Sequence, residues 1–96
     1  MATVAIDDYD VMYSANQVAP HILLMASGSD IGELIFMPDG TQLPSDTTTK
    51  LYYHLQNYSH ILDLLRNEKP VYFVGNGPGK ENGIRTTAEP VGEGEA

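Results

Sequence analysis

Three residues in the second half of the chain could do acid–base or metal chemistry: His54, His60 and Asp63. Imidazole nitrogens and carboxylates bind zinc and transfer protons. His60 precedes Asp63 by three positions, so a helix would carry both on one face. The spacing matches neither H-x-x-x-H nor H-E-x-x-H. A small metal-dependent or acid–base enzyme using these residues is therefore one hypothesis, and a surface hydrogen bond is the simpler interpretation.

The other motifs do not indicate a cofactor. The glycine-rich segment 75–80 has Val74 and Glu81 where a phosphate-binding Walker loop needs glycine and Ser/Thr. The acidic cluster at residues 7–10 meets Met12 where an EF-hand needs Asp or Asn. The absence of cysteine excludes disulfides, thiol nucleophiles and thiolate zinc sites. We therefore predict no catalytic residues, no metal and no cofactor.

Tyrosine is the residue type that suggests binding. The chain has six tyrosines, two phenylalanines and no tryptophan. Tyrosine is enriched in interfaces because it buries a large area and keeps a polar end. Tyr52 and Tyr53 are adjacent in a predicted strand, so they should point to opposite faces. The predicted partner-binding residues are Tyr9, Tyr13, Tyr52, Tyr53 and Tyr72.

Charge restricts the class of partner. The formal net charge is -8, and residues 1–49 hold seven of the 13 acids without any Lys or Arg. Nucleic-acid binding normally needs several basic residues to neutralise phosphates. Direct binding to nucleic acid or to an anionic membrane is thus disfavoured. An acidic nucleic-acid mimic that fills the basic cleft of another protein is a further hypothesis, and it requires the seven acids to project on one face.

The elements that must position these residues are mostly strands. Residues 3–14 are rich in β-formers, and the Asp7–Asp8 pair suggests a bulge or bend within one strand. The run 21–26, a turn at 27–30 and the run 32–37 form a hairpin signal. Further strands are predicted at 51–55, 70–74 and 83–91.

One helix is predicted, over residues 58–67. Apolar residues recur there at i, i+3, i+4 and i+7, Asn57 can serve as N-cap, and Pro70 ends the segment. Short connections favour antiparallel neighbours. We predict an α+β fold in which one short amphipathic helix packs on a curved, mostly antiparallel sheet of about five to six strands. An OB-like, partly open barrel is the alternative.

The chain length of 96 residues allows one domain, which we place at residues 1–91, followed by a flexible acidic tail at 92–96. The N-terminal residues lack a basic segment followed by a long apolar run, so we expect a cytoplasmic protein. The leading functional hypothesis is a non-enzymatic protein-interaction module that binds another protein or a second copy of itself, as a homodimer, through an aromatic sheet face or an exposed edge strand.

Overall fold

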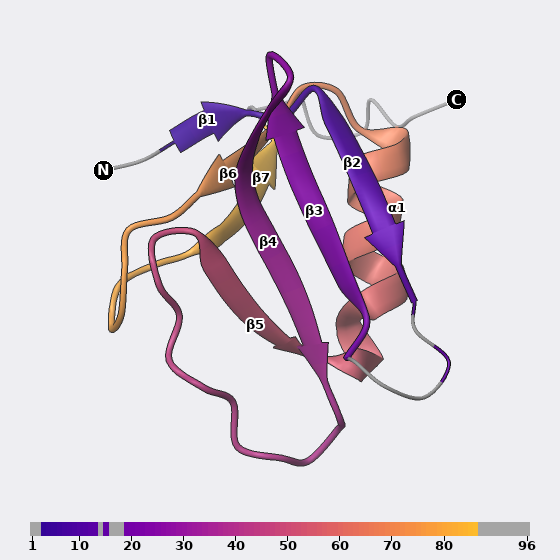
Figure 1. Cartoon of the computed structure of the whole chain (residues 1–96), viewed down its shortest axis with the longest axis vertical. Coiled ribbons are helices and arrows are strands. Elements are labelled where there is room, and N and C mark those ends of the chain that lie inside the picture. Colours follow the sequence, from indigo (N-terminus) through magenta and orange to yellow (C-terminus); the bar gives the residue numbers. More distant parts are fainter. Residues whose placement is uncertain (1–2, 14, 16–18, 87–96) are drawn as a thin grey trace, which may run out of the picture.

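The computed structural model describes residues 3–13, 15 and 19–86, which form seven strands and one α-helix (Figure 1). In chain order the elements are β1 (Thr3–Ala5), β2 (Asp8–Met12), β3 (His21–Ala26), β4 (Ser29–Met37), β5 (Lys50–His54), a 3-10 turn (Leu55–Asn57), α1 (Tyr58–Asn67), β6 (Val71–Val74) and β7 (Gly83–Thr86). The α+β class is confirmed. The predicted tail at 92–96 and the end of the last predicted strand lie outside the described residues.

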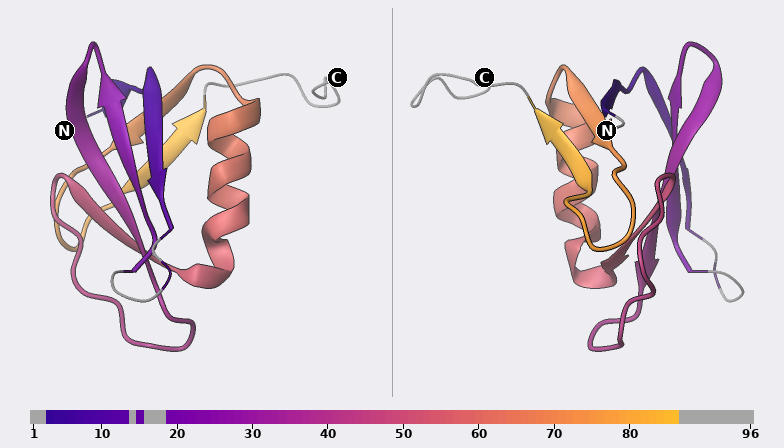
Figure 2. Two further views of the ribbon diagram at one scale, coloured as in Figure 1. Left: turned by 45° about the vertical axis from the view of Figure 1, so that its right-hand side comes forward. Right: turned by 90° about the vertical axis from the view of Figure 1, so that its left-hand side faces the viewer.

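The strands form two sheets, with the orders β2-β3-β4-β5 and β1-β6-β7. Helix α1 and the three-stranded sheet lie on the same side of the four-stranded sheet (Figure 2). No described helix or strand lies on the opposite side of the four-stranded sheet. This arrangement leaves one sheet face covered and one open.

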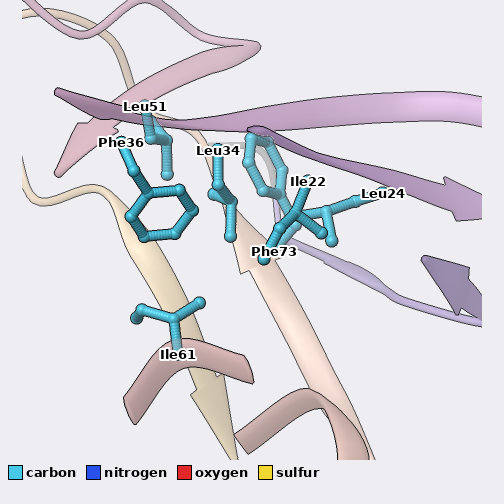
Figure 3. Close-up of a cluster of buried hydrophobic side chains, with 7 residues drawn as sticks. All are labelled: Ile22, Leu24, Leu34, Phe36, Leu51, Ile61 and Phe73. Carbon is cyan, nitrogen blue, oxygen red and sulfur yellow. The ribbon is translucent and has the colours of Figure 1, made fainter. Parts of the chain in front are cut away.

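The core fills the space between the four-stranded sheet and the elements that cover it. The sheet contributes Ile22, Leu24, Leu34, Phe36 and Leu51, all at most 1% exposed. The covering elements contribute Phe73 from β6 and Ile61 from α1. Figure 3 shows Ile61 pointing from the helix toward Phe36. Burial of these apolar side chains is the main driving force for packing the two layers together.

The prediction of a single sheet is wrong, and the first sheet change occurs at the Asp7–Asp8 bend. Strands β1 and β2 belong to different sheets. The amide of Ile6 donates to the carbonyl of Val71 in one sheet, at 2.9 Å, and the next amide, of Asp7, donates to Met25 in the other, at 2.8 Å. The expected bulge is thus a corner at which the chain changes partner. The two sheets share no strand pairing among the described residues, so the barrel alternative is not supported.

The helix begins and ends where the periodicity predicted, at Tyr58 and Asn67. Asn57 does not cap it through its side chain, because Asn57 itself has helical backbone angles in the preceding 3-10 turn. The prediction of a side-chain cap is therefore wrong. The strand predicted at 51–55 is shifted by one residue to Lys50–His54, since Leu55 already belongs to that turn.

The pairing of β4 with β5 is parallel, whereas the short connections favoured antiparallel neighbours. Residues 38–49 connect the two strands, and this length permits the chain to return to the starting end of β4. Asp39–Gly40 does form a turn, but the turn begins this long return instead of closing a hairpin.

Candidate protein-interaction surface

The open side of the four-stranded sheet carries an apolar surface, which we call the outer face. Side chains alternate across a strand, so the buried residues of β3, β4 and β5 identify their neighbours as outward-facing. Six outward-facing side chains are apolar: Met12, Leu23, Met25, Ile35, Met37 and Tyr52. Seven outward-facing side chains are polar: Asp8, Asp10, His21, Asp30, Glu33, Lys50 and His54. Met12 is 56% exposed, and the other five apolar side chains are half-buried. Apolar side chains gathered on an open sheet face indicate an interaction site.

The strand register arranges the outer face in rows that cross all four strands. One row runs Met12, His21, Ile35 and Tyr52, and its neighbour runs Asp10, Leu23, Glu33 and Lys50. The first row is mainly apolar and the second contains two acids and one base. We call the mainly apolar row the apolar centre of the outer face. The acids on the rows to one side of it, from β2 and β4, form an acidic border.

Methionines are concentrated on the outer face. Met12, Met25 and Met37 come from three different strands, and all three face outward. Methionine side chains are flexible and polarizable, and they are common on surfaces that adapt to a partner. Nε2 of His21 lies 4.0 Å from Oε2 of Glu33 on this face, a distance that makes an ion pair when the imidazole is protonated.

The two edges of this sheet differ. The amide of Tyr52 on β5 donates to Oδ1 of Asp46 at 2.9 Å, and the carbonyl of Lys50 accepts from the amide of Thr47 at 2.9 Å. The loop 38–49 therefore occupies backbone groups of β5. Strand β2 pairs only with β3 among the described strands. We call the other side of β2 the free edge. Three side chains at and just after the end of β2 are exposed: Val11 at 37%, Met12 at 56% and Tyr13 at 57%.

A chain of four aromatic rings runs from the end of β2 into the core. Tyr13 packs edge-on against Tyr58 at 5.3 Å between ring centroids, Tyr58 packs against Phe36 at 5.1 Å, and Phe36 stacks on Tyr53 at 5.7 Å. Such pairs add stability beyond simple burial. Burial raises the pKa of the Tyr53 hydroxyl above its ordinary value of 10.0, and the nearby charge of Asp46 raises it further.

The five predicted tyrosines do not share one surface. Tyr52 lies on the outer face, and Tyr53 points the opposite way, as their adjacency predicted. Tyr9 packs against the core, and Tyr13 is exposed near the free edge. Tyr72 lies on β6 opposite Arg85, in the other sheet. Their role in partner binding stays a prediction, and the fold separates them into at least three locations.

The residues of the enzyme hypothesis are not gathered into a metal site. Nε2 of His54 donates to the carbonyl of Thr41 at 2.7 Å, and His60 and Asp63 are exposed on α1. Within the described part of the chain, no three His, Cys, Asp or Glu side chains are placed to hold a metal together. The geometry thus gives no support to that hypothesis.

The acids of the first 49 residues serve different local purposes. Asp7 accepts from the amide of Ser27 at 2.7 Å, Asp39 accepts from the amide of Gln56 at 2.7 Å, and Asp46 accepts from the amide of Tyr52 at 2.9 Å. Asp8 and Asp10 project from the outer face. Asp30 and Glu33 share that face, so four of the seven acids lie on one surface and three do not. The nucleic-acid mimic needs all seven on one surface, and this arrangement does not favour it.

The sequence reasoning missed the apolar residues of the outer face. Residues 21–26 are almost continuously apolar, which is typical of a strand buried on both sides. In the structure only Ile22 and Leu24 of that run are buried. The polar alternation that normally marks an exposed face is absent from this run, because its outward-facing residues after His21, Leu23 and Met25, are also apolar.

Among the described residues, no helix has the length and apolar character needed to cross a membrane. Comparisons of the chain with protein-family models, curated proteins and solved structures found no match.

Proposed function

We propose that the chain is a non-enzymatic protein-interaction module that docks a partner protein on the outer face of its four-stranded sheet. The observation that carries this proposal is the set of six apolar side chains on a sheet face that no described element covers. Large open apolar surfaces are uncommon on isolated domains and mark binding sites. Tyr52, one of the predicted binding residues, lies within this set.

The charge of the outer face favours a basic partner. Four acids provide negative charge there, namely Asp8, Asp10, Asp30 and Glu33, and Lys50 provides one positive charge. A partner with an apolar surface bordered by Lys or Arg would bury the apolar centre and oppose the acidic border. Two copies of the chain would instead bring eight acids and two lysines together, which disfavours self-association at this face.

A photo-crosslinking residue at position 52 tests the proposal in the native cell. We expect a specific adduct with a basic protein from position 52 and none from position 59, where Ser59 is exposed on α1. With the purified partner, Ile35→Lys should weaken binding at least tenfold, because it places a charge in the apolar centre, and Ser59→Lys should not.

The absence of an adduct at position 52, or partner binding insensitive to Ile35→Lys, would contradict the proposed function. Sedimentation of the purified chain provides the check on self-association. A mass of two chains that Ile35→Lys reduces to one would identify a second copy as the occupant of the outer face.

A further inference from the structure

The four-stranded sheet can accept another strand on one side only. The β5 side is occupied by the chain's own loop through Asp46 and Thr47. The β2 side has no described strand beside it. An unpaired edge presents backbone N–H and C=O groups that can form a ladder with an extended chain.

The side chains of β2 define what could pair there. Asp8 and Asp10 point to the outer face, and Tyr9 and Val11 point to the covered side. Acidic and apolar side chains thus alternate along the free edge. Val11 and Tyr13, which follow Tyr9 on the covered side, remain accessible, at 37% and 57% exposed.

Resting on the proposed function, we propose that the free edge of β2 binds an extended segment of the partner protein in which Lys or Arg alternates with apolar residues. Directly opposite side chains in neighbouring strands interact, so bases would face Asp8 and Asp10. Apolar residues of the same segment would contact Tyr9 and Val11 on the covered side. The segment then forms a fifth strand of the sheet, next to β2. The rest of the partner protein docks on the outer face.

The same charges oppose pairing between two copies. A parallel pairing of β2 with itself places each acid opposite its own counterpart. An antiparallel pairing centred on Asp10 places the two Asp10 carboxylates opposite each other. Like charges directly opposite destabilise a strand pair, and charged side chains are a common protection of edge strands. Asp8 and Asp10 therefore disfavour self-pairing in these registers and favour a basic strand.

A blocked heptapeptide of alternating valine and lysine is the direct probe, added to the isotope-labelled full chain. We expect amide NMR shifts concentrated in residues 8–12 and 21–26, and an affinity that falls as NaCl rises. The matched peptide with glutamate in place of lysine should bind at least tenfold more weakly. Two further peptides carry N-methyl groups at odd or at even positions; one should lose binding and the other retain it, because alternate amides face the strand.

A charge-reversal variant tests the role of the two acids. Asp8→Lys combined with Asp10→Lys should reverse the preference, so that the glutamate peptide binds at least tenfold more tightly than the lysine peptide. Asp63→Lys, on the exposed side of α1, changes the net charge without touching the edge and should preserve the original preference.

Three results would overturn the edge proposal. These are equal loss of binding by both N-methylated peptides, no binding of the lysine peptide, and NMR shifts confined to the centre of the outer face. The crosslink at position 52 separates this failure from failure of the proposed function. If the adduct forms while the peptide does not bind, only the edge proposal fails. If the peptide binds and no adduct forms, only docking on the outer face fails.

Discussion

At the scale of single residues, the packing around Phe73 requires a glycine on the facing strand. A Cβ added to Gly32 would lie 2.5 Å from Cζ and 2.6 Å from Cε1 of the Phe73 ring. Real side chains do not approach this closely, so the ring would have to move. Phe73 is only 1% exposed and has little space to move into.

Gly32→Ala should therefore lower the free energy of unfolding by about 1–3 kcal/mol, the usual cost of overpacking. Urea unfolding followed by circular dichroism measures this change. In a Phe73→Leu background the same substitution should cost less than half as much, because the ring atoms that it meets are gone. Equal costs in the two backgrounds would show that the ring is not the obstacle.

Tyr53 should make stability fall at alkaline pH. Burial, with the charge of Asp46 second, raises its pKa in the folded chain above the 10.0 of the unfolded chain. Above pH 10 the unfolded state therefore binds fewer protons, and the free energy of unfolding decreases as pH rises toward the raised pKa. Below pH 10 the hydroxyl is protonated in both states and has no such effect.

Tyr53→Phe should reduce the loss of stability between about pH 8 and about pH 11, measured by urea unfolding at both values. Tyr52→Phe, from the neighbouring position on the outer face, is the matched control. An unchanged alkaline loss in Tyr53→Phe would rule out the titration of this hydroxyl as a cause.

At the scale of elements, the loop between β6 and β7 depends on one side chain. Oδ1 of Asn82 accepts from the amides of Asn76 and Gly77, at 2.6 Å and 3.1 Å. Its Nδ2 donates to the carbonyls of Gly77 and Lys80, both at 2.9 Å. A longer bond of 3.4 Å to Oδ2 of Asp46 connects this loop to the loop beside β5.

Asn82→Ala should cost about 1–3 kcal/mol, since it leaves several polar backbone groups without partners. Hydrogen exchange at the amides of Asn76 and Gly77 should accelerate. Asn82→Asp keeps the acceptor, so it should restore slow exchange at these two amides while remaining destabilised by its approach to Asp46. Fast exchange in both variants would contradict the assigned role of Oδ1.

Some features of the fold are determined by local sequence, and others depend on distant contacts. Helix α1 was predictable to the residue because its periodicity is contained within ten consecutive positions. The division into two sheets was not, because the Asp7–Asp8 bend fits a bulge as well as a corner, and only the distant partners Met25 and Val71 distinguish them. The outer face escaped prediction for a similar reason: an apolar run does not reveal which half of its side chains meets water.

At the scale of the whole molecule, the charge of -8 should make stability depend on salt. Four acids share the outer face of the four-stranded sheet: Asp8, Asp10, Asp30 and Glu33. The basic group described within 4.0 Å of one of them is the imidazole of His21, beside Glu33. The mutual repulsion of the four acids opposes the compact state and is screened by added ions.

Raising NaCl from about 10 mM to about 150 mM should therefore increase the free energy of unfolding. Asp30→Lys removes one acid and adds one base at an exposed position, so its stability should rise less over the same range. A salt response equal to that of the unchanged chain would show that the repulsion is not centred on this sheet.

The loop that covers β5 has a consequence for stoichiometry. A sheet with two available edges can polymerise, because each added strand offers another edge to the next molecule. Here Asp46 and Thr47 occupy backbone groups of β5, so the four-stranded sheet contributes a single growth point, at β2. A strand added at β2 would therefore end at this sheet, because β5 offers no second edge for another strand. We expect a complex formed at β2 to contain one partner per chain.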